Sequence, residues 1–197
     1  MPFKQIFRFF KIKYKPAQGE GDDLKNSYEF TYDIIKGHNE SGLEIKESFT
    51  LKSHDEPVEK FRDALQGLKP HLTGYCELPK EYVSRVTVRG ISISYGDHED
   101  GRKIPGVIIT GVMKYKKSNG VLVLNSPFKQ SEFLKDSGGD ESKLLDAECM
   151  EVIEDLFSES ERYLKGEREK VEIDFADKKE ENKNKKIHEL KLEQKNQ

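Results

Sequence analysis

Three segments near the start of the chain alternate hydrophobic and polar residues, which is the pattern of a half-buried β-strand. They span residues 6–14, 27–36 and 43–51. Their aromatic and β-branched side chains favour strands over short helices. The residues that share one face are Ile6, Arg8, Phe10, Ile12 and Tyr14 in the first, Tyr28, Phe30, Tyr32 and Ile34 in the second, and Leu43, Ile45, Phe49 and Leu51 in the third. The chain is therefore expected to begin with three strands.

The period changes to that of a helix after the third strand. Apolar residues recur at steps of three and four between Val58 and Leu68, which predicts a helix over about 56–68. Asp55 precedes it at a position suited to an N-cap. Pro70 is expected to end it, because proline cannot continue the hydrogen-bonded ladder.

Alternation returns at residues 82–95, where the apolar positions change parity at Gly90. A β-bulge or bend at this glycine would restore a single buried face. Two further strands are expected at 107–116 and 121–124. They are joined by Asn119-Gly120, a dipeptide typical of a tight hairpin. The middle of the chain is therefore expected to form a second group of strands.

The longest helical pattern lies in the C-terminal third. Apolar residues recur at helical spacing from Leu144 to Leu164, with Asp140 placed to cap the helix and Gly166 placed to end it. Residues 167–197 contain nine acidic and nine basic side chains and few apolar ones. We expect this tail to be helical or disordered, because it cannot form a core of its own.

The expected order is β-β-β-α-β-β-β-α followed by a charged tail. This order predicts an α+β protein, built either on a mainly antiparallel sheet or on an OB-like barrel, with a long C-terminal helix. The expected organisation is a β-rich domain over 1–137, an acidic amphipathic helix over 138–166 and the tail over 167–197.

Charged residues make up 36% of the 197 residues, against roughly 25% in an ordinary domain. No apolar run approaches the ~18–20 residues of a spanning helix, so a membrane-embedded protein is excluded and no membrane partner is expected. The first 15 residues interleave Lys and Arg with apolar side chains, unlike a secretory signal. Cys76 and Cys149 show no metal-binding spacing and are expected to be free thiols. A cytoplasmic protein is the simplest expectation.

The sequence contains no motif that points to catalysis. It has no phosphate-binding GxxxxGK[ST] loop, no GxSxG elbow and no HExxH pair. Its five histidines are scattered, without a local nucleophile or an orienting partner. The acidic run around Asp97 is followed by Arg102 and Lys103, which favours an exposed hairpin tip over a metal site. We therefore expect a protein that is not an enzyme, with no catalytic residues, no metal and no cofactor.

The net charge of −3 conceals an uneven distribution. Residues 1–15 carry five bases and no acid, and residues 102–117 also carry five bases and no acid. Residues 129–161 carry eleven acids against three lysines. Basic strands with interleaved aromatic rings are typical of proteins that bind single-stranded nucleic acid, where cations contact phosphates and rings stack on bases. The candidate nucleic-acid-binding residues are Lys11, Lys13, Tyr14, Arg85, Arg89, Lys114, Tyr115 and Lys116.

Three stretches in the middle of the chain carry a resemblance. They are VTVRGISISY (86–95), GVIITG (106–111) and VLVLNSPF (121–128). They resemble uncharacterised accessory proteins of phages and mobile elements, in which a "GVVITG" strand is followed by a hairpin return ending in an "NTP" or "NSP" turn. The resemblance covers about 45 residues and carries no catalytic motif. It implies a small phage-type accessory protein in the host cytoplasm, near replication or recombination functions.

Two functions from different classes therefore compete. The first is binding of single-stranded nucleic acid on a basic β surface. The second is a protein–protein module, an inhibitor or adaptor of a host factor, that acts through the acidic C-terminal helix and tail. A variant of the second is a homo-oligomer formed through residues 140–164.

Overall fold

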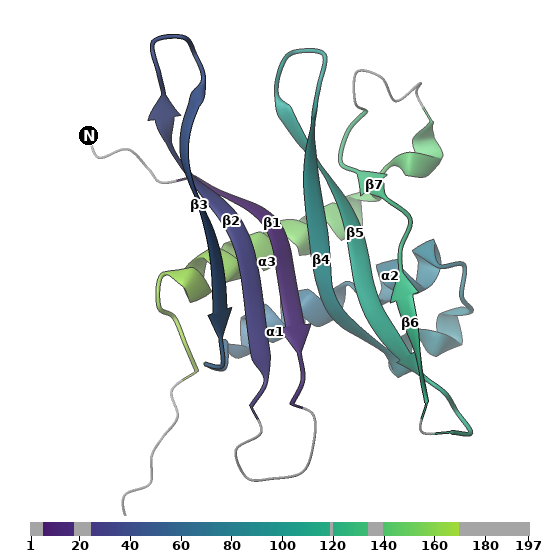
Figure 1. Ribbon diagram of the computed structural model, residues 1–197. Coiled ribbons are helices and arrows are strands. Elements are labelled where there is room, and N and C mark those ends of the chain that lie inside the picture. The colour runs from purple at the N-terminus through teal and green to yellow at the C-terminus, as the bar shows by residue number, and fades with distance from the viewer. Residues whose placement is uncertain (1–5, 18–24, 119, 134–139, 170–197) are drawn as a thin grey trace, which may run out of the picture.

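The chain folds into an antiparallel sheet with all its helices on one face. The computed structural model describes residues 6–17, 25–118, 120–133 and 140–169. In Figure 1 the helices lie behind the strands, and the face toward the viewer carries none. The strands are β1 (Ile6–Lys15), β2 (Ser27–His38), β3 (Glu44–Ser53), β4 (Val86–Asp97), β5 (Lys103–Lys114), β6 (Val121–Asn125) and β7 (Lys129–Gln130). The helices are α1 (Glu59–Gly67), α2 (Lys69–Tyr75) and α3 (Ala147–Leu164), with short 3₁₀ turns η1 (Lys80–Arg85) and η2 (Glu141–Lys143).

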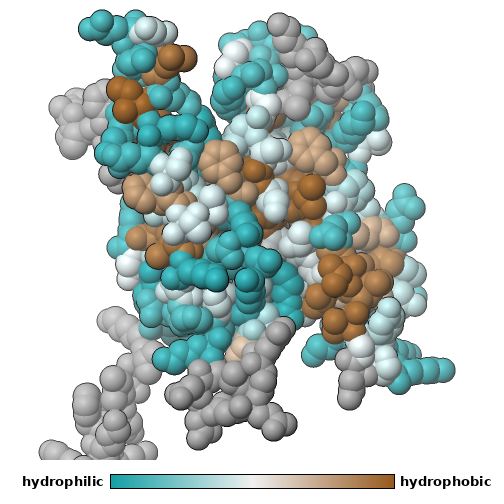
Figure 2. Space-filling view, in the orientation of Figure 1, coloured by the Kyte–Doolittle hydropathy of each residue, from teal (hydrophilic) through white to brown (hydrophobic). Residues whose placement is uncertain are grey.

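The spatial order of the strands is β3-β2-β1-β4-β5-β6, and the short β7 pairs with β5 beyond the end of β6. β3 and β6 form the two edges, so the sheet is open. The predicted α+β class is confirmed, in its antiparallel-sheet form. Several exposed apolar residues lie on these edge strands, and Figure 2 shows one such group over β6. This group consists of Val121, Leu122 and Val123.

The sheet is built from two matching halves. Each is a three-stranded meander that leads to a helix packed on the same face, namely β1-β2-β3 with α1 and β4-β5-β6 with α3. β1 and β4 meet at the centre, where Ile12 faces Ile91. Both central strands carry a β-bulge, at Phe10 in β1 and at Arg89 in β4. The two halves are thus related by an approximate twofold axis that passes between Ile12 and Ile91.

The register supports this relation residue by residue. Phe9 faces Tyr32 in the first half, and Val88 faces Gly111 in the second. After each bulge, Lys11 faces Thr31 and Gly90 faces Thr110. Each residue of β4 and β5 stands 79 positions after its equivalent in β1 and β2, as 88 minus 9 and 111 minus 32 show. The sequence does not reveal this repeat, because most equivalent side chains differ.

The core lies between the sheet and the three helices. Tyr28, Phe30 and Phe61 are fully buried there together with Tyr163, and their rings lie 5.0–6.1 Å apart between centroids. Aromatic pairs at such distances contribute about 0.5–1.5 kcal/mol each beyond the area they bury. Because Tyr163 comes from α3, this helix belongs to the same core as the first three strands.

The strands agree with the sequence pattern except in phase and extent. Strict alternation places Phe10 on the same face as Ile12, but the bulge at Phe10 shifts the phase, so Phe9 and Ile12 are the buried residues of β1. The prediction of a bulge near Gly90 is confirmed. Residues 80–85 form η1 instead of extending the strand, and β5 begins at Lys103, earlier than expected.

The helix boundaries differ more. Asp55 does not cap α1, whose N-cap is Val58 without a side-chain hydrogen bond. Pro70 does not end the helical region, because it occupies the first turn of α2. Asp140 caps η2, whereas Asp146 caps α3 by accepting a hydrogen bond from the Cys149 amide at 2.7 Å. Gly166 follows the end of α3 with a φ of 102°, as expected of a glycine after a helix. Residues 170–197 of the predicted tail lie outside the described residues.

Within the part of the chain that the structure describes, no helix has the length and apolarity needed to cross a membrane. Cys76 and Cys149 are unpaired, as expected for free thiols, and only Cys149 is fully buried.

Candidate functional site

The antiparallel topology brings the predicted site residues to one end of the sheet. β1 and β5 end where β4 begins, at the bottom of Figure 1. The candidates occupy the last part of β1, the start of β4 and the end of β5, so strands far apart in sequence present them together. They divide into two groups, one around β5 and η1 and one around β1.

The first group lines a groove between η1 and the end of β5, which we call the basic groove. It contains Arg85, Lys114, Tyr115 and Lys116 from the predicted set. Its complete lining is Glu81, Tyr82, Ser84, Arg85, Thr87, Lys114, Tyr115 and Lys116. The surface continues along the β5–β6 hairpin past Lys117. Three cations and two tyrosine rings therefore face the same space, with Glu81 as the one acid in the lining.

Arg85 is held in place by contacts with its neighbours. Its Nε and Nη2 donate to the carbonyl oxygen of Lys114 at 2.9 and 2.6 Å, and its guanidinium lies over the Tyr82 ring, 4.8 Å from the centroid. The cation–π contact and the two hydrogen bonds fix the orientation without neutralising the charge. Among the described residues, no carboxylate lies within 4.0 Å of a charged nitrogen of Arg85, Lys114 or Lys116.

The second group lies on β1 and at the bulge of β4. Lys11 donates to Glu29 at 2.6 Å, and this ion pair lowers the pKa of the Glu29 carboxyl. Lys13 faces Gly90 across the central ladder and makes no ion pair within the described ranges. Arg89 lies over the Tyr14 ring at 5.4 Å from the centroid. Lys11 is therefore the candidate whose charge is compensated, while Lys13 and Arg89 keep theirs.

Several cations elsewhere on the sheet are paired. Lys103, at the opposite end of β5 from Lys114, donates to Asp97 at 2.6 Å. Lys46 donates to the buried Asp33 at 2.6 Å, and Arg8 forms a two-bond contact with Glu44 at 2.5 and 2.7 Å. The basic groove differs from these positions because its cations lack such partners among the described residues.

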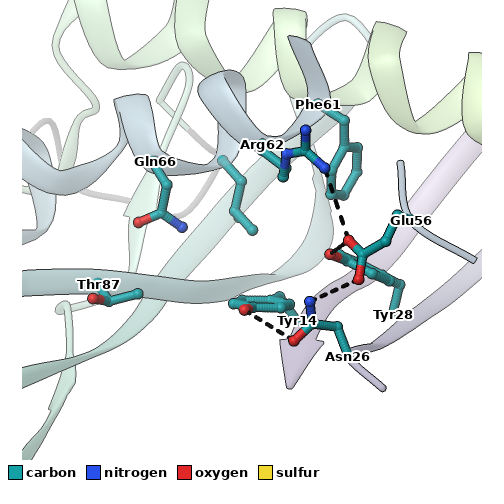
Figure 3. Close-up of a pocket in the computed structure, with 9 residues that line it drawn as sticks. Tyr14, Asn26, Tyr28, Glu56, Phe61, Arg62, Gln66 and Thr87 are labelled. Carbon is teal, nitrogen blue, oxygen red and sulfur yellow. Dashed lines mark hydrogen bonds and ion pairs between the residues drawn. The ribbon is translucent and has the colours of Figure 1, made fainter. Parts of the chain in front are cut away.

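A cavity of about 310 Å³ adjoins the groove and shares Thr87 with it. We call it the inter-strand cavity. Figure 3 shows Thr87 on one side and Tyr14 opposite, with a polar cluster to the right. The cavity is lined by Tyr14, Asn26, Tyr28, Glu56, Phe61, Arg62, Leu65, Gln66 and Thr87. Its volume lies at the lower end of the ~300–1,000 Å³ typical of ligand pockets.

The polar cluster of the cavity is centred on Glu56. Its carboxylate accepts hydrogen bonds from the Tyr28 hydroxyl and the Asn26 amide, each at 2.7 Å, and Arg62 lies 3.8 Å away. Burial and the bond to Glu56 together raise the pKa of Tyr28 far above its usual value. Tyr28 therefore remains a neutral hydrogen-bond donor at any physiological pH.

Several residues that line the basic groove and the inter-strand cavity were not predicted from the sequence. Tyr82 and Thr87 lie in or next to η1, and neither stands out in a strand pattern. Glu56 and Asn26 lie in loops and meet only in the folded chain. Lys117 was identifiable from its place in the acid-free segment 102–117.

The acidic helix lies on the opposite face from the open side of the sheet. Cys149, Ile153 and Leu156 of the predicted apolar stripe are buried in the chain's own core. A partner, or a second copy using residues 140–164, would thus meet the acidic outer side of α3. The described residues contain no group of three or more His, Cys, Asp or Glu side chains arranged to hold a metal ion.

Comparison of the chain with protein-family models, with curated proteins and with solved structures gives no match.

Proposed function

We propose that this protein binds single-stranded nucleic acid along the basic groove. The observation that carries the proposal is the convergence of Arg85, Lys114 and Lys116 on one groove, without carboxylate partners among the described residues. Unpaired cations repel one another and destabilise the fold slightly, so their grouping is explained by an anionic ligand that neutralises them. A phosphate backbone is such a ligand.

The aromatic residues of the groove favour a single strand over a duplex. Tyr115 is exposed, and Tyr82 is half-buried beneath the Arg85 guanidinium. An exposed ring can stack on an unpaired base, a contact worth about 1–3 kcal/mol, whereas the bases of a duplex already stack on one another. Lys13 and Arg89, at the same end of the sheet, can extend the path of the bound nucleic acid toward β1. The phage or mobile-element setting is part of the proposal and rests on the resemblance of residues 86–128 alone.

The test is a salt-titrated binding measurement. Fluorescence anisotropy of a labelled single strand of about 15 nucleotides, matched to the usual site sizes, reports the association constant as sodium chloride is raised. For three phosphate contacts in the groove, the slope of log K against log salt is expected near −2, from about −0.7 per contact. Lys114→Ala and Lys116→Ala should each weaken binding and reduce the slope by about 0.7.

Lys103→Ala is the matched control. It removes the same charge from the other end of β5, where Asp97 already compensates it. This variant should bind the strand like the wild type. Absence of binding at low salt, or equal losses for Lys103→Ala and Lys114→Ala, would exclude the proposal. Tighter binding to a duplex of the same sequence would exclude its single-stranded form.

A further inference from the structure

The short pairing of β1 with β4 leaves two gaps in the sheet, which the approximate twofold axis relates to each other. The two gaps differ in what fills them. β1 and β4 pair over only three residues each, Lys11–Lys13 with Gly90–Ser92. One gap lies between the start of β1 and the end of β4. The other lies between the end of β1 and the start of β4. Because the halves match in register, the contents of the two gaps can be compared position by position.

An aromatic ring from the chain itself fills the first gap. Tyr95 of β4 donates its hydroxyl to the Phe9 carbonyl of β1 at 3.1 Å. Arg8 lies over the Tyr95 ring at 5.3 Å, and Phe10 meets it edge-on at 5.6 Å between centroids. Burial raises the pKa of Tyr95 to about 12. A planar ring with a polar group at its tip is thus the natural occupant of this gap.

Among the residues that the structure describes, no such ring fills the second gap. The position equivalent to Tyr95 is Pro16, 79 residues earlier and just past the end of β1. The side chain of Gln66 makes hydrogen bonds with the amide and carbonyl of Val88 at 3.2 and 3.0 Å, in place of the missing β1 backbone. The space that remains is the inter-strand cavity of about 310 Å³.

The chemistry of the cavity fits a ring that carries N–H donors. Tyr14, Tyr28 and Phe61 provide aromatic surfaces, and Arg89, the equivalent of Phe10, lies over the Tyr14 ring. Glu56 already accepts one hydrogen bond on each oxygen, and each carboxylate oxygen can accept a second. A heteroaromatic ring with an exocyclic amino group satisfies both features.

We propose that the inter-strand cavity receives one unstacked, amino-bearing base of a strand whose phosphates lie in the basic groove. This inference rests on the proposed function, because Thr87 lines both spaces and so places the cavity next to the groove. The base takes the place that Tyr95 takes in the matching gap. Cytosine meets the requirement, and thymine, which lacks the amino group, does not.

The experiment compares oligocytidine with oligothymidine of equal length, by anisotropy at fixed salt. The wild type should bind oligocytidine about ten-fold tighter, as expected for one inserted base. Thr87→Phe places a ring at the mouth of the cavity and should abolish the preference for oligocytidine over oligothymidine. Ser92→Phe is the matched control, since Ser92 is exposed on the same strand and outside the cavity lining, and it should behave as the wild type.

Glu56→Gln is the second variant, which preserves size but replaces one of the two acceptor oxygens with an NH2 donor and removes the negative charge. It should abolish the preference for oligocytidine, and its circular dichroism spectrum reports whether the fold is intact. Salt-dependent binding with no preference between the two strands, or a preference that survives both Thr87→Phe and Glu56→Gln, overturns the inference and leaves the proposed function standing. Absence of salt-dependent binding to either strand overturns the proposed function itself.

Discussion

Gly90 is the residue on which the junction between the two halves of the sheet depends most directly. It has a φ of 154°, and a Cβ atom added there would lie 2.1 Å from the Ile12 carbonyl oxygen and 2.9 Å from Lys13 Cα. Both contacts are with backbone of β1, which cannot rotate away as a side chain can. Gly90→Ala therefore has to push β1 away from β4 at the short ladder that joins the halves.

The loss in free energy of unfolding caused by Gly90→Ala can be estimated from two contributions. Backbone strain at an unfavourable φ costs on the order of 1–3 kcal/mol. Weakening two hydrogen bonds of the central ladder costs about 0.5–1.5 kcal/mol each. Together they predict that Gly90→Ala lowers the free energy of unfolding by about 2–6 kcal/mol, out of the ~5–15 kcal/mol typical of a domain.

Urea denaturation, followed by far-UV circular dichroism and tyrosine fluorescence, measures this change. The control is Gly74→Ala in α2, because nothing lies within 4 Å of a Cβ atom added at Gly74. This substitution should leave stability unchanged or raise it by up to ~1 kcal/mol. If Gly90→Ala unfolds within about 1 kcal/mol of the wild type, β1 does not approach β4 as closely as the structure shows.

Two further predictions concern stability. Asp146→Ala removes the α3 cap that accepts from the Cys149 amide, and it should lower the free energy of unfolding in urea by about 1–2 kcal/mol, whereas Asp146→Asn, which keeps a capping oxygen, should lose much less. For Asp33, burial alone would raise the pKa of the carboxyl, but the hydrogen bonds from Lys46 and Ser48 outweigh it and hold the pKa below its usual value. Asp33 therefore stabilises the fold above the ordinary carboxyl pKa near ~3.9, and this contribution is lost as the pH falls through its lower folded-state pKa. Asp33→Asn should be destabilised at neutral pH and approach the wild type in acid unfolding; a difference that is constant from pH ~7 to ~2 contradicts this explanation.

The strand pattern was predictable because alternation survives wherever one face of a strand is buried. Tyr28 and Phe30 of β2 are buried on one face as their spacing indicates. The bulge at Phe10 was not predictable in the same way, because the apolar residues on both sides of it obscure the change of phase. At Gly90 the change was visible, since small and polar residues separate the apolar ones.

The candidate site was predictable in residue type but not in grouping. Lys114 and Lys116 come from an acid-free segment and have no carboxylate partner among the described residues, whereas Arg102 and Lys103 of the same segment are paired. The pairing of Lys11 with Glu29 depends on the register of β1 against β2, which the sequence alone does not determine. The inter-strand cavity depends on the relation between the two halves, and side-chain identity conceals that relation.

The two halves depart from twofold symmetry at the two gaps between β1 and β4, and we infer a structural role for one gap and a binding role for the other. In the first gap, Arg8 is neutralised by Glu44 and covers a ring that belongs to the chain, so the contact is complete within the fold. In the second gap, Arg89 covers Tyr14 without a carboxylate partner among the described residues, beside a cavity that the described residues leave unfilled. The same strand geometry thus provides internal packing at one end and an open pocket lined by aromatic and polar side chains at the other. A fold that required the second gap only for stability would be expected to fill it as it fills the first, because an unfilled cavity forfeits packing contacts.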